Sequence, residues 1–245
     1  MKTACVILIG NEILSGRTQD TNLTYLGQGL NEVGVRLISA RVIPDVTEVI
    51  ADTVNECRAT HDYLFTTGGI GPTHDDITAD AIAKAFGVEL VRDPGAVAAL
   101  RTHYTSDDDL NEQRLKMCDI PQGAELIHNP ISKAPGFCIE NVYVLAGVPV
   151  IMQAMFDGLK DNLVGGEPML SRSIACYIGE SLLAARLGEI QAAHSSVEIG
   201  SYPFIRDGKL GASLVMRSTD AATNDAAADA IREMILSLGA EPIEE

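Results

Sequence analysis

The sequence contains no tryptophan, and aromatic residues make up only 4% of its 245 positions. Hydrophobic residues nevertheless reach 46%, which is enough to bury a sizeable core and excludes a disordered chain. With so few aromatic rings, that core must be built from Val, Ile, Leu, Ala and Met. This composition is typical of a parallel sheet that is covered by helices.

Basic residues are scarce as well. The chain has 18 Lys and Arg against 34 Asp and Glu, so its formal net charge is -16. Such a surface repels nucleic acid and anionic membranes, because binding either one requires Lys and Arg to displace counterions. We therefore expect no nucleic-acid and no membrane partner. A free nucleotide is repelled too, so any phosphate site needs backbone N–H groups, a few cationic side chains or a metal ion.

Paired cysteine motifs and long apolar runs are also missing. The chain has 5 cysteines without a Cys-x-x-Cys pair, which is typical of small core residues in a reducing cytosol. The apolar run near the N-terminus is too short for a signal peptide with its cleavage site, and no run approaches the ~18 residues of a membrane span. We expect a cytoplasmic protein.

Hydrophobic periodicity predicts strands that alternate with helices in the first half of the chain. The expected strands are residues 4–9, 35–43, 63–67 and 88–91. The expected helices start near residues 20–21, after Pro44 with Asp45 and Glu48 spaced as a capping box, and at residue 77. This alternation predicts a parallel sheet, in which ligands bind at loops that leave the carboxyl ends of strands. Residues 10–16 and 68–76 are such loops.

The second half of the chain changes its pattern at a predicted linker, Gly165-Gly166-Glu167-Pro168. Before it we expect helices at 94–104, 110–117 and 147–163, strands at 125–127, 137–139 and 142–145, and an acidic break at 106–109. After it, strand–helix–strand–strand–helix over residues 170–238 predicts a small α+β domain with an antiparallel sheet. The predicted domains are therefore an α/β domain over residues 1–166 and an α+β domain over residues 167–245.

The most unusual segment is TTGGIGPTHDD at residues 66–76. Gly68, Gly69 and Gly71 lie between a strand and a helix, so consecutive N–H groups can face a phosphate beside the positive end of the helix dipole. An ordinary strand-to-helix turn also contains glycines. Hydroxyl groups add to the evidence for an anion site, and they come from Thr66, Thr67 and Thr73.

Two adjacent carboxylates, Asp75 and Asp76, stand at the expected start of the following helix. In one interpretation, one of them caps that helix. In the other, both lie beside a phosphate, where their repulsion would cost several kcal/mol at intermediate dielectric unless a cation lies between them. Mg²⁺ commonly binds one or two carboxylates together with substrate phosphates. The sequence favours metal-assisted phosphate binding with Asp75 and Asp76 as the metal ligands.

Two further loops supply candidate partners for this site. After the first strand, Glu12 is a candidate metal ligand or general base and Ser15 a candidate phosphate contact, unless both belong to an exposed turn. In the loop at 129–137, Asn129 is a candidate ligand contact. Lys133 is the candidate cationic phosphate contact, with a solvated surface lysine as the alternative.

These segments resemble one family, the N-terminal region of the CinA proteins, which has the MoaB/Mog molybdopterin-binding fold. The resemblance is carried by residues 9–16 (IGNEILSG), 66–76, 129–130 (NP) with 134–137 (APGF), and 147–149 (GVP). The tail is similar to the small domain that follows in CinA, at residues 178–181 and 187–188. The chain stops before the amidohydrolase domain of full-length CinA, so we do not expect deamidation of nicotinamide mononucleotide.

The resemblance implies a three-layer α/β/α domain, a cytoplasmic location and a homo-oligomer, most often a dimer. It implies hydrolysis of ADP-ribose-like dinucleotide pyrophosphates with a divalent cation (Mg²⁺ or Co²⁺) and K⁺. The Mog branch implies instead that the chain binds molybdopterin and adenylylates its phosphate, and a non-catalytic nucleotide-binding protein is a third hypothesis. By motif match, Asp75 and Asp76 would be the catalytic carboxylates, assisted by Glu12. The phosphate would be held by Thr67, Gly68, Gly69, Gly71 and Thr73.

Overall fold

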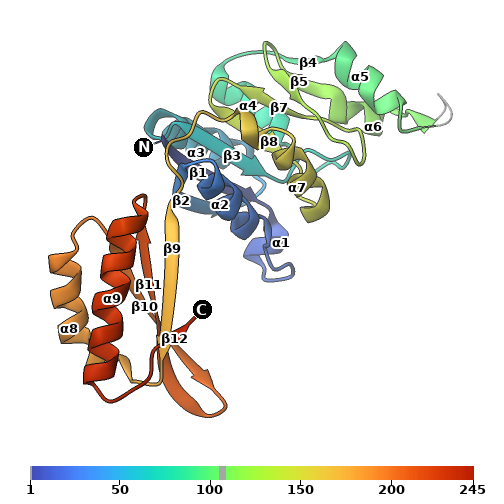
Figure 1. The fold of residues 1–245 in the computed structure, drawn as a ribbon. Helices are drawn as coiled ribbons and strands as arrows, with labels where there is room; N and C mark the ends of the chain where they lie inside the picture. The colour runs from blue at the N-terminus through green and yellow to red at the C-terminus, as the bar shows by residue number, and fades with distance from the viewer. Residues whose placement is uncertain (1, 105–108) are drawn as a thin grey trace. The chain divides into compact units, whose positions relative to one another are not determined.

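The computed structural model describes residues 2–104 and 109–245, so most of the predicted acidic break at 106–109 lies outside the described residues. The chain divides into two compact units, Met1–Gly166 and Glu167–Glu245. Figure 1 labels the helices and strands of both units.

The large unit is built on a six-stranded sheet with the order β2-β1-β3-β8-β7-β6. The strands β2, β1, β3 and β8 run parallel to one another, whereas the pairs β8–β7 and β7–β6 are antiparallel. Their bounds are β1 Lys2–Ile9, β2 Val35–Ile43, β3 Tyr63–Thr67, β6 Glu125–Ile127, β7 Gly136–Ile139 and β8 Val142–Leu145. The prediction of a mostly parallel α/β sheet is confirmed.

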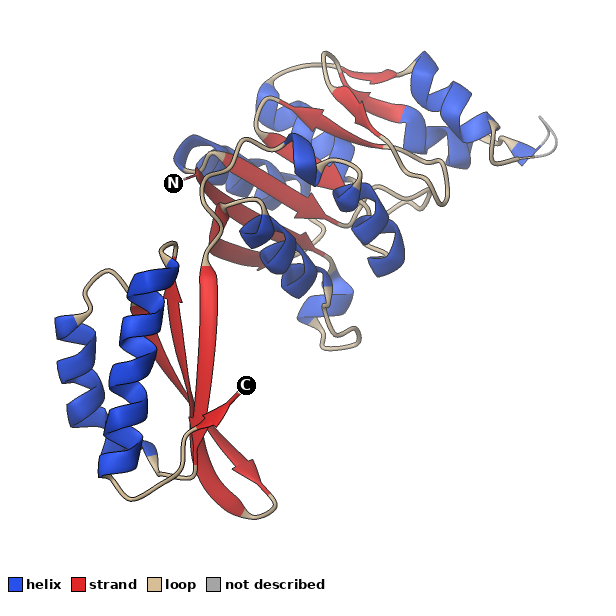
Figure 2. Cartoon of the chain, viewed as in Figure 1, coloured by secondary structure: helices blue, strands red, loops and turns tan. Residues whose placement is uncertain are grey.

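Helices cover both faces of this sheet, which gives three layers (Figure 2). The strand β1 is buried on both sides, because successive side chains point to opposite faces. Cys5, Ile7 and Ile9 pack under α3 (Thr47–Thr60) and α4 (Thr78–Phe86). On the other face, β1 packs under α2 (Asn22–Glu32) and α7 (Pro149–Asp157) through Ala4, Val6 and Leu8.

Several local predictions are corrected by the structure. Residues 10–16 are not a plain loop, because they contain the short helix α1 (Asn11–Leu14). The helix predicted to reach residue 163 ends at Asp157 and is followed by the 3-10 turn η3 (Lys160–Asn162). The capping box is wrong: α3 begins after Val46 without a side-chain cap. The carboxylate of Asp45 accepts a hydrogen bond from the backbone of Asn11 instead, at 2.8 Å.

The strand predicted at 88–91 lies outside the main sheet. It is β4 (Leu90–Arg92), which pairs antiparallel with β5 (Asp119–Pro121), a strand that the sequence did not indicate. Between these strands lie α5 (Pro94–Arg101), α6 (Glu112–Leu115) and the 3-10 turn η2 (Lys116–Cys118). The carboxylate of Asp93 caps α5 by accepting from the backbone N–H of Ala96 at 2.8 Å.

The small unit has a four-stranded antiparallel sheet in the order β10-β11-β9-β12, with both helices on one face (Figure 2). Its elements are β9 Leu170–Cys176, α8 Glu180–Ala193, β10 Glu198–Arg206, β11 Lys209–Ser218, α9 Ala221–Ser237 and β12 Ile243–Glu244. Asp207 and Gly208 both have positive φ, as a two-residue hairpin requires. The predicted α+β organisation is confirmed.

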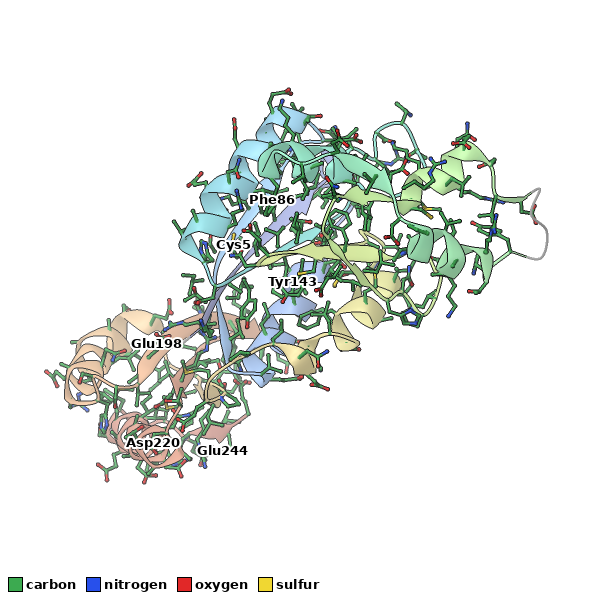
Figure 3. The ribbon with its side chains drawn as sticks, turned by 90° about the horizontal axis from the view of Figure 1, so that it is seen from above. Cys5, Phe86, Tyr143, Glu198, Asp220 and Glu244 are labelled. Atoms are coloured by element: carbon green, nitrogen blue, oxygen red, sulfur yellow. The ribbon has the colours of Figure 1, made fainter. Side chains whose placement is uncertain are left out.

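The cysteines are core residues, as expected. All are free; Cys138 is half-buried and the others are buried, including Cys5, which is labelled in Figure 3. Burial raises the pKa of the Cys118 thiol to about 11, so this thiol stays protonated and unreactive at neutral pH. Within residues 2–104 and 109–245, none of the helices combines the length and the apolar character needed to cross a bilayer.

Candidate functional site

A cavity of about 520 Å³ opens in the large unit at the carboxyl ends of the parallel strands. Its walls come from loops that follow β1, β2, β3 and β8, together with residues 129–134. Parallel strands bring these loops to the same edge of the sheet, which is where α/β proteins bind ligands. The volume lies within the range of ligand pockets. The loops singled out in the sequence, at 10–16 and 68–76, thus border one cavity.

The glycine turn at the end of β3 brings the main chain to this cavity. Gly68 and Gly69 have φ values of 104° and 68°, a region that favours glycine. A Cβ on Gly68 would lie 2.2 Å from the carbonyl oxygen of Ile9, and a Cβ on Gly69 would lie 2.2 Å from Oγ1 of Thr78. Thr78 in turn fastens the turn to α4, because its hydroxyl donates to the Gly68 carbonyl at 3.0 Å. The turn therefore has room for main chain only.

Asp75 and Asp76 converge on the hydroxyl of Thr73. Its Oγ1 lies 2.5 Å from Oδ1 of Asp75 and 2.5 Å from Oδ2 of Asp76. A hydroxyl carries one proton and can donate to one of the two carboxylates at a time. The bond from Thr73 holds the pKa of Asp75 below its ordinary value, with smaller contributions from His74 and Lys116.

Neither aspartate caps the following helix. The residue before α4 is Ile77, which makes no side-chain cap. Asp76 accepts instead from the backbone N–H of Thr73 at 2.8 Å, within its own loop. The capping interpretation of this pair is therefore wrong. Both carboxylates line the cavity.

The cavity wall is acidic. Its described lining residues include the four carboxylates of Glu12, Asp45, Asp75 and Asp76 but no Lys, Arg or His. In the part of the chain that the structure describes, no group of three or more His, Cys, Asp or Glu side chains is arranged to hold a metal ion. A closed metal centre made by protein alone is thus absent there. The donor set fits a hard cation such as Mg²⁺, which takes one or two carboxylates and completes its shell with ligand phosphates and water.

Asp45 is a site residue that the sequence interpretation missed. It follows β2 and reaches the cavity, while its Oδ2 accepts from the N–H of Asn11 at 2.8 Å and so fixes the start of α1. That bond orders the helix turn that carries Glu12. The signal was present as a polar residue directly after a buried strand, but the spacing of Asp45 and Glu48 suggested a helix cap.

Other predicted contacts lie away from the cavity wall. Thr67 and Thr73 do not line it, and neither do Ser15 and Lys133. The hydroxyl of Ser15 donates to the carbonyl of Glu12 at 3.2 Å. Lys133 lies in its loop with a φ of 62°. The roles proposed for these four residues stay predictions.

Asn129 lines the cavity, but its amide organises its own loop. The Nδ2 group donates to Oγ of Ser132 at 2.7 Å and to the carbonyl of Ala134 at 2.8 Å. Its Oδ1 accepts from the N–H groups of Ile131 and Ser132. With the side chain 2% exposed, these bonds indicate that Asn129 shapes the wall.

Comparison with known proteins identifies the class. Residues 5–165 match the family model described as probable molybdopterin binding domain, so the chain belongs to this family. Residues 168–241 match the model of the middle domain of FAD synthase.

Individual relatives define the branch more closely. A protein of Archaeoglobus fulgidus is 34% identical over 200 residues, which cover 81% of this chain and 84% of that protein. A probable FAD synthase of Caenorhabditis elegans is 30% identical over 96% of this chain, which corresponds to 50% of that protein. The crystal structure of CinA from Thermoplasma acidophilum, a protein of unknown function, superposes with a TM-score of 0.62 at 36% identity, over 66% of this chain and 97% of that chain. The predicted resemblance to CinA is confirmed.

Proposed function

We propose that the large unit is a metal-dependent nucleotide pyrophosphatase that hydrolyses ADP-ribose-like dinucleotide pyrophosphates. The observation that carries this proposal is the acidic cavity wall: four carboxylates and no cationic side chain line a ligand-sized space beside the glycine turn. Such a wall repels a pyrophosphate by itself. With a cation between wall and ligand, the same wall attracts the pyrophosphate.

Hydrolysis of ADP-ribose consumes one water molecule. The water oxygen bonds to one phosphorus, the bond from that phosphorus to the bridging oxygen breaks, and AMP and ribose 5-phosphate are released. A bound divalent cation would neutralise phosphate charge and lower the pKa of a bound water. Asp75 and Asp76 would hold the cation, and Glu12 would accept the proton of the water. N–H groups at residues 69–71 would bind phosphate oxygens, since the N–H of Gly68 donates to the carbonyl of Leu145 at 3.2 Å.

A direct assay tests this proposal. The purified protein is incubated with ADP-ribose and Mg²⁺ or Co²⁺, with and without K⁺, and AMP is measured by chromatography. We expect AMP only when a divalent cation is present, and we expect its loss when EDTA is added. AMP release that persists with EDTA, or no AMP with either metal, contradicts the proposal.

A second candidate function is binding of molybdopterin, with adenylylation of its phosphate. It is favoured by the family match over residues 5–165. The N–H groups of a pterin ring would also suit carboxylates that accept hydrogen bonds. Calorimetric titration distinguishes the two functions, because binding of molybdopterin without binding of ADP-ribose and metal supports the second. Binding of ADP-ribose without turnover would make the chain a nucleotide-binding protein.

The segments around the cavity also expose apolar side chains. Leu14, Ile131, Val148 and Val150 are between 42% and 59% exposed, and burial of such side chains is a common driving force of self-association. We expect a homo-oligomer, most simply a dimer, that sediments as such in analytical ultracentrifugation. A monomer at micromolar concentration contradicts this expectation.

A further inference from the structure

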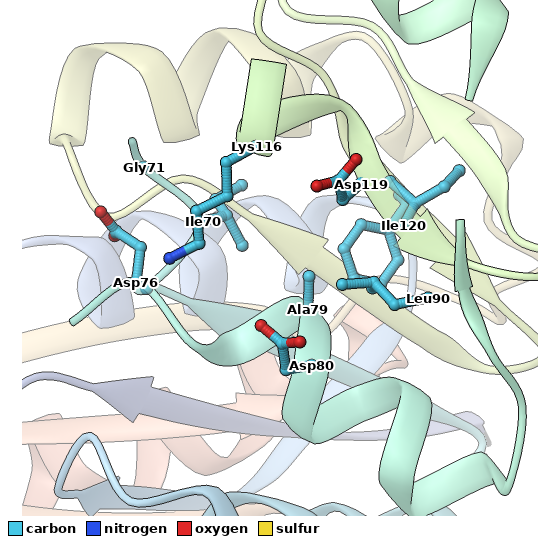
Figure 4. A pocket seen from close by; sticks show the side chains of 11 residues that line it. Ile70, Gly71, Asp76, Ala79, Asp80, Leu90, Lys116, Asp119 and Ile120 are labelled. Atoms are coloured by element: carbon cyan, nitrogen blue, oxygen red, sulfur yellow. The ribbon is translucent and has the colours of Figure 1, made fainter. Parts of the chain in front are cut away.

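Lys116 lies beside the acidic loop of the candidate site. It begins the η2 turn, is half-buried, and borders a small cavity of about 20 Å³ together with Asp76, Asp80 and Asp119. Figure 4 shows its side chain reaching toward the loop that holds Gly71 and Asp76. This narrow niche holds about one water molecule, and the lysine that borders it is partly shielded from solvent.

The ammonium group has a specific partner in this loop. Its Nζ donates to the carbonyl oxygen of Thr73 at 2.8 Å. The same carbonyl accepts from the N–H of Asp76 at 3.3 Å, while the hydroxyl of Thr73 contacts both Asp75 and Asp76. Thr73 is therefore the residue through which the conformation of both carboxylates is fixed, and Lys116 is bonded to it.

The loop has few other means of keeping its shape. Residues 72–75 are exposed, so little apolar burial orders them. Two neighbouring carboxylates also repel each other. The nearby Arg92 is occupied elsewhere, because it pairs with Asp119 at 2.9 Å and Glu112 at 3.0 Å. Among the described residues that border the small cavity, Lys116 is the cation that contacts the loop.

We propose that Lys116 is a positioning residue, whose ammonium group anchors the Thr73 carbonyl and so holds Asp75 and Asp76 in place on the cavity wall. It acts through the loop and does not need to touch the ligand. The inference builds on the proposed pyrophosphatase site, but the order of the loop can be measured without any substrate. Lys116 lies 17 residues from the Lys133 that the sequence suggested, and only the fold brings it to the site.

The first test is hydrogen exchange at the amides of Thr73 and Asp76, followed by NMR. Lys116→Met keeps the bulk of the side chain but removes its charge, and Lys116→Arg keeps the charge. We expect exchange about tenfold faster in Lys116→Met, in line with the loss of a hydrogen bond to a charged donor, and near-parental exchange in Lys116→Arg. Lys84→Met is the matched control, because Lys84 on α4 pairs with Glu48 on α3, and neither residue lines the cavity.

The second test is chemical rescue. Lys116→Ala removes three methylene carbons and the ammonium group, and propylammonium supplies the same atoms. Added propylammonium should slow exchange at the two amides again in Lys116→Ala but not in Lys116→Met, whose side chain still fills the niche. Unchanged exchange in Lys116→Met, or fast exchange in Lys116→Ala that propylammonium does not slow, overturns the inference.

Activity is measured in parallel with ADP-ribose and Mg²⁺. We expect AMP release by Lys116→Ala to fall at least about tenfold and to recover with propylammonium, chiefly through kcat. If the parent protein releases no AMP, the proposed function fails, while the exchange measurements still decide the role of Lys116. If the parent is active and both variants exchange like the parent, the role of Lys116 fails alone.

Discussion

The carboxylates on the surface of the small unit and those at the cavity of the large unit differ in how they are paired. In the small unit, acidic side chains pair with arginines: Arg172 with Asp225, Arg206 with Glu245, and Arg232 with both Asp229 and Glu244, all at 2.6 to 2.7 Å. At the cavity of the large unit, the ion pair recorded among the described residues is a long one, 3.9 Å from His74 to Asp75.

This difference separates stability from function. Exposed ion pairs each contribute about 0–1 kcal/mol and neutralise the surface. Carboxylates that gather on a wall without Lys, Arg or His are expected where a ligand or metal supplies the missing positive charge. The small unit still has 12 acidic against 6 basic residues, but several of its carboxylates lie in arginine pairs. The four carboxylates on the cavity wall of the large unit share that wall with no Lys, Arg or His among its described lining residues.

The largest expected effect is on activity at the cavity. Asp76→Ala, and likewise Asp75→Ala, should reduce AMP release by roughly 100-fold or more, because each removes a ligand that acts on the charge of the transition state. The free energy of unfolding should change by less than about 1 kcal/mol, since both groups are solvent-accessible. Initial rates and urea unfolding measure the two effects.

The matched control is Asp229→Ala, which removes a paired carboxylate from the small unit. It should leave AMP release at the parental level. The comparison breaks down if Asp229→Ala loses activity as the cavity variants do, or if both cavity variants turn over like the parent.

A second prediction contrasts glycines of the two units that share a positive φ. Gly69 has a φ of 68°, and an added Cβ would meet Oγ1 of Thr78 at 2.2 Å; Gly208 has a φ of 74° with open space around it. Gly208→Ala should lower the free energy of unfolding by only about 1 kcal/mol, which is the cost of placing a Cβ at a positive φ. Gly69→Ala should lower the free energy of unfolding by about 1–3 kcal/mol more than Gly208→Ala does, because the buried Thr78 must move.

Urea unfolding of both variants tests this prediction. Equal losses of stability would show that the turn at Gly69 has room to adjust, and the account of a turn that admits only main chain would then be wrong. Loss of ADP-ribose binding in Gly69→Ala at a stability close to the parental one would instead sharpen the contrast between the units.

Features decided by residues that are close together in the sequence could be predicted, whereas features decided by distant residues could not. Strands such as 35–43, 63–67 and 142–145 were placed to the residue, because their apolar patterns are local and bounded by turn residues. The β4–β5 pair was missed because two three-residue strands separated by 26 residues carry no local signal.

The candidate site shows the same limit. The loops that border the cavity were predicted, because parallel topology brings strand ends together. The interpretation of Asp45 as a cap was wrong, since the N–H of Asn11, 34 positions away, competes for its carboxylate. Lys116 was overlooked, because its contact with Thr73 spans 43 positions. Pairings of this kind are decided by the tertiary fold and leave no spacing to recognise.

The smallest expected effect lies in the arginine pairs of the small unit. Arg232 bonds to Glu244, and this bond holds the pKa of Glu244 below its ordinary value. A lowered carboxyl pKa adds stability above the ordinary value of about 4.3, and that stability is lost as the pH falls through the lower, folded-state pKa. Arg232→Met should lower the free energy of unfolding by less than about 1 kcal/mol at pH 7, and the difference in urea midpoint between parent and variant should shrink as the pH falls through the lowered pKa of Glu244. AMP release should not change. A loss of stability that persists at low pH would show that Arg232 acts through the packing of its methylene groups, and the contrast between structural and functional charges would then hold only for the carboxylates.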